Sequence, residues 1–441
     1  YFKRDPWSFR FEGSSVKGAR EDQQDWYGTV GSSVAHTELS PERQEAIGTA
    51  GDWDNAVLFV AGDGHGGSAK MGPLILRVLD ELKGEEPKTI HEAQEKLSLI
   101  HQELQKWYFK NGRGGTSICY AIVVNNGEDS FIVGASVGDS YLGICDQTGE
   151  EPDFVVLPQW SWNSPEGQEM LQVFADELGM RVPETQVRSG VLEYEDRYRV
   201  SFRIPGQFYA FQPPETTGLE ARHQFDDVPE DSKEKIAAIF AGADPKHQMA
   251  WNCKTLHVGS LEGISVHFVS DGISSKGSLG TSSVLKDSEF KNYITLQHEK
   301  TSIKDLFHIL TNEPSTNNFW KYLTDNEKMR QMYVGEGNKF IRFWFEDEIY
   351  ELDGSDSWEK FLTLPDQEIL DAIYDFTSSW AAIDSDWVEA FDKAYQRLSQ
   401  PKGSGSLELE WTHHLAVLAG VSDDNTSGCR MLGFTDAAHS A

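Results

Sequence analysis

The chain has 441 residues, of which 39% are apolar and 25% are charged, and its formal net charge is −32. This composition is typical of a globular protein, and the length allows two or three domains or one large domain with an insertion. The negative charge opposes binding to nucleic-acid phosphates and to an anionic membrane surface, so we expect neither as a partner.

The spacing of the cysteines and the length of the apolar segments indicate the cellular compartment of the protein. Cys119, Cys145, Cys253 and Cys429 form no CxxC pair and no short spacing, which argues against a zinc ribbon or a disulfide scaffold. No stretch approaches the ~18 consecutive apolar residues of a membrane span, and the first residues lack the apolar core of a secretion signal. We therefore expect reduced thiols and a cytoplasmic protein.

Short apolar runs bounded by Gly, Asp or Asn predict β-strands in the first half of the chain. They lie at residues 57–61, 117–124, 130–135 and 141–145. Residues 89–110 instead place apolar side chains at spacings of three and four between charged ones, which predicts an amphipathic helix. Two further runs, at residues 264–269 and 415–421, predict strands late in the chain.

The composition changes between residues 277 and 405, where aromatic and acidic residues are frequent. Helix-like stretches lie at residues 302–310, 319–332 and 366–398, and residues 401–406 have the composition of a linker. We predict a helical insertion at 277–405 in a discontinuous core formed by residues 11–276 and 406–436.

Three of the apolar runs end in an aspartate followed by a turn-forming residue. These aspartates are Asp63, Asp271 and Asp424. A strand fixes its end rigidly, and carboxylates gathered at strand ends would repel one another unless a cation lay between them. The repetition predicts an all-oxygen site for a divalent cation. Each Asp-Gly or Asp-Asn pair alone is a common turn, so the argument depends on the three together.

A fourth acidic segment adds an arginine to this pattern. Arg20 lies five residues before Asp25. A guanidinium offers a bidentate fork to a tetrahedral oxyanion, so an arginine beside a metal cluster suits a phosphate group.

Residues 62–67 also satisfy the GxGxxG pattern of dinucleotide-binding proteins. A nicotinamide-dependent oxidoreductase is therefore an alternative. It requires strands that alternate with helices after this turn and an acid at the end of the second strand, and it leaves the other Asp-terminated strands unexplained.

Taken together, these motifs resemble the PPM family, the metal-dependent serine/threonine phosphatases of protein phosphatase 2C type. The resemblance rests on the Arg-to-Asp element, the FVAGDGHGG strand and turn, the small-residue entry GGTS, and the short motifs GDS, SDG and DN, in this order. They lie at residues 20–25, 59–67, 114–117, 138–140, 270–272 and 424–425.

The resemblance implies an α+β fold in which two packed antiparallel β-sheets are flanked by helices on both sides, an α-β-β-α sandwich, with the large insertion added. It also implies two Mg²⁺ or Mn²⁺ ions at one end of the sandwich. Asp63 would bridge the ions, the Gly64 carbonyl and Asp25 would help on one side, and Asp271 and Asp424 would hold the other. Asp139 of the GDS motif would serve a weaker third ion.

The implied activity is hydrolysis of phosphoserine and phosphothreonine in a phosphoprotein by a metal-activated water. Arg20 would bind the phosphoryl oxygens, and His65 would protonate the leaving oxygen. The alternative is a catalytically weak or inactive scaffold that binds a partner protein through residues 277–405. Gln24 and Ser275 favour this alternative, because many members of the family carry acids there.

Overall fold

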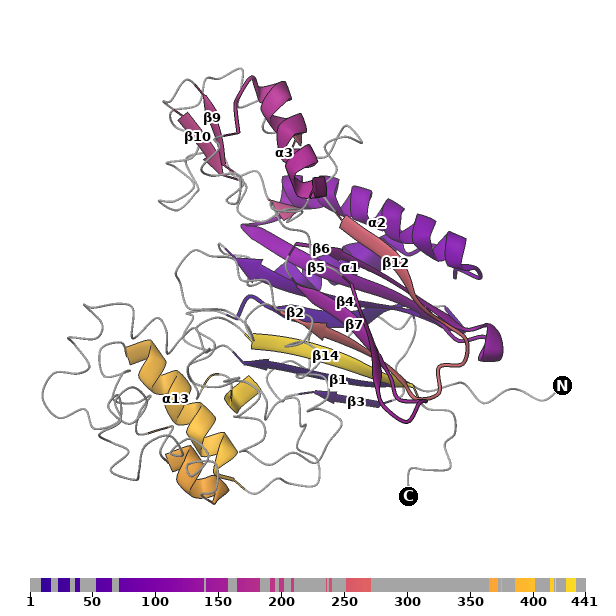
Figure 1. Ribbon diagram of the computed structural model, residues 1–441, viewed down its shortest axis with the longest axis vertical. Coiled ribbons are helices and arrows are strands. Elements are labelled where there is room, and N and C mark those ends of the chain that lie inside the picture. Colours follow the sequence, from indigo (N-terminus) through magenta and orange to yellow (C-terminus); the bar gives the residue numbers. More distant parts are fainter. Residues whose placement is uncertain are drawn as a thin grey trace, which may run out of the picture. The chain divides into compact units, whose positions relative to one another are not determined.

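The computed structural model describes two large β-sheets, a two-stranded sheet and several helices (Figure 1). The described residues are 9–16, 23–31, 36–39, 53–65, 71–138, 140–157, 165–182, 191–194, 198–201, 208–209, 235, 238–239, 251–270, 365–371, 374, 385–400, 413–415, 417 and 426–433.

The first sheet contains the strands that precede and follow the DGHGG turn. Its order is β12 (Trp251–Val258), β6 (Phe131–Val137), β5 (Gly115–Val124), β4 (Ala56–His65) and β2 (Trp26–Val30), and the short strand β11 (Phe208–Tyr209) pairs with β5. Each of these pairings is antiparallel. The central strands β4 and β5 are largely buried runs of apolar residues, as expected for strands covered on both faces.

The second sheet has the order β3 (His36–Leu39), β1 (Phe9–Val16), β14 (Thr426–Gly433), β13 (Ile264–Val269), β7 (Tyr141–Asp146) and β8 (Asp153–Val156). Strand β13 pairs antiparallel with β14 and with β7, so the last strand of the chain lies beside a strand from its middle. Strand β8 closes this edge through an antiparallel pairing with β7.

Side chains on the two faces of the first sheet belong to two different hydrophobic cores. Val57, Phe59 and Ala61 of β4 belong to a buried cluster that also contains Val266 and Phe268 of β13. The two sheets therefore pack face to face, as the family resemblance implies.

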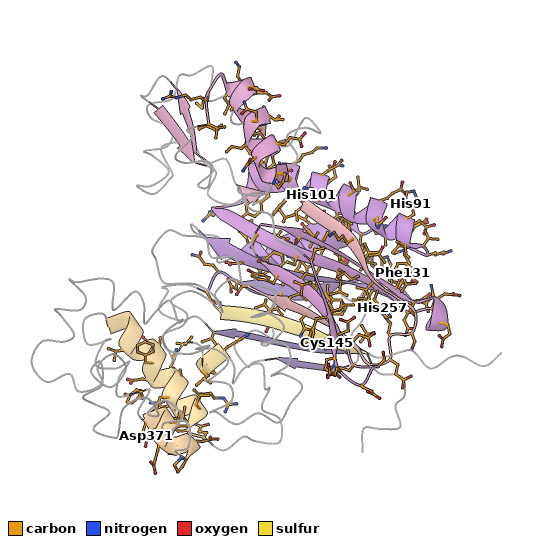
Figure 2. The ribbon with its side chains drawn as sticks, in the orientation of Figure 1. His91, His101, Phe131, Cys145, His257 and Asp371 are labelled. Carbon is orange, nitrogen blue, oxygen red and sulfur yellow. The ribbon has the colours of Figure 1, made fainter. Side chains whose placement is uncertain are left out.

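The other face of the first sheet is covered by α1 (Met71–Leu82) and α2 (Ile90–Asn111) (Figure 1). Thr89 caps α2 by accepting a hydrogen bond from the Glu92 amide at 3.2 Å. His101 of α2 and Phe131 of β6 are buried residues of this layer (Figure 2). The amphipathic helix predicted at residues 89–110 is confirmed.

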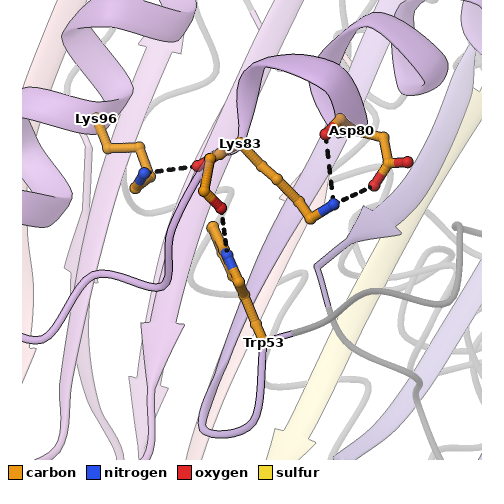
Figure 3. A network of polar contacts seen from close by, with 5 residues as sticks. Trp53, Asp80, Lys83 and Lys96 are labelled. Atoms are coloured by element: carbon orange, nitrogen blue, oxygen red, sulfur yellow. Dashed lines mark hydrogen bonds and ion pairs between the residues drawn. The ribbon is translucent and has the colours of Figure 1, made fainter.

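Polar contacts fix the loop between α1 and α2 to the start of β4 (Figure 3). The Trp53 indole nitrogen donates to the Gly84 carbonyl at 2.9 Å, and the Lys96 ammonium donates to the Lys83 carbonyl at 2.5 Å. Burial lowers the pKa of Lys96, and the charges of Glu85 and Glu92 partly offset this effect.

A helix and a two-stranded hairpin follow β8 in the sequence. Helix α3 (Pro165–Leu178) has its own buried cluster, which includes Phe174 and Leu192. Leu192 belongs to β9 (Val191–Tyr194), which pairs antiparallel with β10 (Tyr198–Ser201). A short 3-10 helix, η2 (Gly127–Asp129), joins β5 to β6.

The chain divides into two compact units. The first comprises residues 1–12, 24–270 and 428–441, and the second comprises residues 13–23 and 271–427. In the second unit, Tyr395 of α13 (Ser385–Leu398) stacks on Tyr374, with the ring centroids 4.3 Å apart. Residues 366–371 and Tyr374 are helical. The boundaries proposed from the sequence, 277 and 405, stay a prediction, and the stretches 302–310 and 319–332 lie outside the described residues.

One predicted strand is wrong. Residues 415–421 were expected to form a strand, but Leu415 and Val417 are helical, as are His413 and His414 before them, while residues 416 and 418–421 lie outside the described residues. The run LAVLAG is continuously apolar, and such a run fits a buried helix as well as a buried strand. The expected second layer of helices also stays a prediction: α1 and α2 pack against the outer face of the first sheet, and no extensive contact of the described helices places one on the outer face of the second sheet. None of the described helices has the length and apolar character needed to cross a membrane.

Candidate functional site

Asp25 and Asp63 lie at the same end of two neighbouring strands. In the antiparallel pair of β2 and β4, Trp26 is opposite Gly62. Asp25 directly precedes Trp26 and Asp63 directly follows Gly62, so the register brings two acids that are far apart in the sequence to one end of the strand pair. The sequence predicted both residues as metal ligands, and the structure places them together.

The burial of these acids differs. Asp25 is fully buried, and Asp63 is half-buried. Val57, Phe59 and Ala61 face the second sheet, so the alternation of β4 directs Asp63 toward the same side. A buried carboxylate is costly unless hydrogen bonds or a positive charge compensate for it. The register brings two carboxylate-bearing residues to neighbouring strand ends, and Gly64 follows Asp63 in the chain. Carboxylate and carbonyl oxygens are the donors that Mg²⁺ and Mn²⁺ prefer.

Strand β5 supports the end of β4 from the other side. Asp63 pairs with Ser117, and Gly64 pairs with Thr116. The Thr116 hydroxyl donates to the Asp63 carbonyl at 2.8 Å and also lies 3.0 Å from the Ser117 carbonyl. The backbone that carries the Asp63 carboxylate is therefore held by a side chain as well as by the sheet.

A pair of serine hydroxyls joins this end of the first sheet to the second sheet. The Ser117 and Ser140 hydroxyl oxygens are 2.5 Å apart, and both side chains are buried. Ser140 directly precedes β7, and the β7 residue Tyr141 pairs with Val269, the last residue of β13. The ends of β4 and β13, which the sequence predicted to carry site acids, therefore lie at one end of the two packed sheets.

The remaining predicted site residues are only partly placed. The backbone of His65 is the last residue of β4. Arg20, Asp139, Asp271, Asp424 and the side chain of His65 lie outside the described residues. Within the described ranges, no three acids, histidines or cysteines gather as a metal-binding group. The complete set of metal ligands stays a prediction.

The antiparallel sheet excludes the dinucleotide alternative. The GxGxxG pattern needs a parallel strand-helix-strand unit around its first strand. Strand β4 instead pairs antiparallel with both β2 and β5. Residues 62–65 continue β4 to its end, so the glycines at 62 and 64 belong to the strand itself.

The sequence assigned no role to Thr116, Ser117 or Ser140, although they lie in its GGTS and GDS motifs. Small hydroxyl residues at the start of a strand are ordinary, so nothing local distinguishes them. Their position opposite Asp63 and across the two sheets is what distinguishes them.

Several solved structures are similar to the chain, and they include phosphatases of the 2C type. A serine-threonine phosphatase 2C from Toxoplasma gondii is 11% identical over 70% of this chain and 91% of its own, with a TM-score of 0.38. The S. agalactiae serine/threonine phosphatase is 15% identical over 69% and 92%, with a TM-score of 0.32. The catalytic domain of the phosphatase PstP in complex with two manganese ions is 10% identical over 97% and 99%, with a TM-score of 0.32.

These identities and TM-scores are too low to carry an argument about activity. No family model and no curated protein matches the chain. The chain's own motifs and the strand ends that the structure brings together are the features that bear on its function.

Proposed function

We propose that the chain is a metal-dependent protein serine/threonine phosphatase that hydrolyses phosphoserine and phosphothreonine. The observation that carries the proposal is the placement of Asp25 and Asp63 at one end of the β2–β4 pair, with Gly64 next in the chain after Asp63. This placement unites two acids of separate sequence motifs, and it does so at the end that the Ser117–Ser140 contact joins to the second sheet.

Asp25, Asp63 and the Gly64 carbonyl would hold one side of a pair of Mg²⁺ or Mn²⁺ ions. Asp271 and Asp424 would hold the other side, and Asp139 would serve a weaker third ion. When bound, such ions lower the pKa of water and act as Lewis acids on a phosphoryl group.

The other proposed roles belong to Arg20 and His65. The Arg20 guanidinium would bind two phosphoryl oxygens and balance their charge as it grows in the transition state. The His65 imidazole, which follows Gly64 in the sequence, would donate its proton to the leaving serine or threonine oxygen. Phosphate release would then need no covalent bond to the protein.

The proposed substrate is a phosphoprotein in the cytoplasm, and residues 277–405 are the proposed surface for a protein partner. A catalytically weak scaffold remains the second candidate, because Gln24 precedes Asp25 where many phosphatases of this type carry an acid. The two candidates differ in turnover.

Hydrolysis of an aryl phosphate and of a phosphothreonine peptide tests the proposal directly. We expect activity with Mn²⁺ or Mg²⁺, loss of activity with a chelator, and a decrease of at least about 100-fold in Asp63→Asn, since one bridging carboxylate is removed. Asp129→Asn is the matched control, because Asp129 lies in η2, beyond the opposite end of β5 from Thr116.

The hydrolysis and metal-binding measurements distinguish the phosphatase from the scaffold. A decrease of at least about 100-fold in Asp63→Asn, with the activity of Asp129→Asn unchanged, supports the phosphatase. Metal binding by calorimetry without any turnover supports the scaffold, and the absence of both metal binding and turnover overturns the assignment of the acidic strand ends.

A further inference from the structure

We propose that Ser117 and Ser140 form a positioning latch, the Ser117–Ser140 latch, that sets the metal affinity of the Asp25–Asp63 end of the sheet. This inference rests on the proposed function. It assigns a role to two residues outside the predicted set of metal and phosphate ligands.

The contact itself joins two sheets. The two hydroxyl oxygens are 2.5 Å apart, and the residues are 23 positions apart in the sequence. Ser117 is fully buried and Ser140 is 3% exposed. A hydrogen bond shielded from water is stronger than an exposed one, and a buried hydroxyl that loses its partner is destabilising. The pair therefore holds a fixed geometry between β5 of the first sheet and the start of β7 in the second.

Each end of the latch is next to a residue of the proposed metal site. Ser117 lies opposite Asp63 in the β4–β5 pair, and its neighbour Thr116 donates to the Asp63 carbonyl at 2.8 Å. Ser140 directly follows Asp139 in the sequence. The latch therefore joins the residue opposite Asp63 in the first sheet to the residue that precedes β7 in the second.

A second contact keeps Ser140 in place from the same strand. The Cys119 thiol, two residues along β5 from Ser117, donates to the Ser140 carbonyl at 3.2 Å. Strand β5 thus holds Asp63 through Thr116 on one side and holds Ser140 through both Ser117 and Cys119 on the other. This arrangement makes β5 the element that sets the spacing between the two sheets at the acidic end.

Loss of the latch should weaken Mn²⁺ binding clearly while lowering the Tm without metal only slightly. Residues that orient ligands without contacting the ion typically change metal affinity by about 10–100-fold when they are mutated. Because the two hydroxyls act as one bond, removal of either should have nearly the full effect, and removal of both should add little.

The test compares Ser117→Ala, Ser140→Ala and the double variant with Ser136→Ala. Ser136 is a matched control because it is a buried serine, 2% exposed, on β6, the strand that neighbours β5. For each protein we would measure the Mn²⁺ dissociation constant by calorimetry, the Tm without metal, and the kcat for an aryl phosphate at saturating Mn²⁺.

We expect the Mn²⁺ dissociation constant to rise about tenfold in each single latch variant. In the double variant it should be at most about twofold higher than in either single variant. The kcat at saturating Mn²⁺ should stay near the wild-type value. If Ser117→Ala does not fold, Ser140→Ala tests the same bond from the other sheet. Unchanged Mn²⁺ affinity in Ser140→Ala, or an equal loss of affinity in Ser136→Ala, overturns the latch.

The failure of the latch and the failure of the proposed function give different results. If the unchanged protein binds Mn²⁺ and hydrolyses the aryl phosphate while the variants bind Mn²⁺ equally well, only the latch is overturned. If the unchanged protein binds Mn²⁺ without turnover and the variants bind it more weakly, the latch is supported and the phosphatase is overturned. If the unchanged protein does not bind Mn²⁺, both are overturned.

Discussion

The rings of Phe59 and Phe268 meet between the two sheets, with their centroids 6.3 Å apart and their planes inclined by 38°. Phe59 belongs to β4 and Phe268 to β13, the two strands that the sequence extends into Asp63 and Asp271. Both rings are buried, so this pair contributes to the sheet packing that positions the proposed site.

We predict that Phe59→Ala and Phe268→Ala each lower the free energy of unfolding by about 3–5 kcal/mol, because each leaves a cavity between the sheets. The double variant should lose about 0.5–1.5 kcal/mol less than the sum, since the ring contact is counted in both single variants. Urea unfolding measures these values. Leu99→Ala, at a side chain that is 54% exposed, is the control and should stay within about 0.5 kcal/mol of the unchanged protein. Full additivity would contradict the ring contact.

The Trp26 ring packs directly on the backbone of Gly62, one residue from both Asp25 and Asp63. A Cβ atom at Gly62 would overlap the Cε2 and Cζ2 atoms of this ring. We predict that Gly62→Ala lowers the free energy of unfolding by about 1–3 kcal/mol through overpacking. Urea unfolding of Gly62→Ala, Trp26→Leu and the double variant checks this cause, because the smaller side chain should reduce the loss that Gly62→Ala adds. If Gly62→Ala lowers stability equally with and without Trp26→Leu, steric overlap is the wrong explanation.

The thiols of Cys145 and Cys253 should be unreactive in the folded chain. Burial raises the pKa of each thiol to about 11, and the charge of Asp146 adds to this effect at Cys145 (Figure 2). At pH 8 about one such thiol in a thousand is ionised, compared with about one in ten at the reference pKa of 9.0. We therefore expect iodoacetamide to label both at least about 100-fold more slowly than in guanidinium, as measured by mass spectrometry. Equal labelling rates would contradict the raised pKa.

The same shifts predict a loss of stability in alkaline solution. The folded chain holds these two protons more tightly than the unfolded chain, whose thiols have the reference pKa of 9.0. Their contribution to the free energy of unfolding is thus fully present below pH 9 and decreases as the pH rises toward about 11. Urea unfolding between these pH values should show a shallower decrease in Cys253→Ala than in the unchanged protein. An identical decrease in both would exclude Cys253 as a contributor.

The sequence predicts the central elements well because their signals are local. The apolar run at residues 57–61 and the acid that follows it are contained in a single strand, and α2 follows from its own apolar spacing. The 415–421 run failed for the opposite reason, since a continuously apolar segment has no period that separates a helix from a strand.

The relationships within the site depend on register and packing, which local patterns do not contain. The sequence predicts Asp25 and Asp63 as ligands, but only the pairing of Trp26 with Gly62 brings their strand ends together. The Ser117–Ser140 contact is harder still to predict from the sequence. It joins two sheets, and it involves two small polar residues of a type that is usually exposed to solvent.

Thr116 offers a last test of how the end of β4 is supported. Its hydroxyl donates to the Asp63 carbonyl, and its side chain is fully buried. Thr116→Val keeps the shape and removes this donor, so we predict a loss of about 1–2 kcal/mol in the free energy of unfolding and weaker Mn²⁺ binding. Thr116→Ser retains the hydroxyl and should bind Mn²⁺ like the unchanged protein despite a small cavity. Urea unfolding and calorimetry on the two variants separate the effects. Equally weak Mn²⁺ binding in both would show that the methyl group, and not the hydrogen bond to Asp63, supports the site.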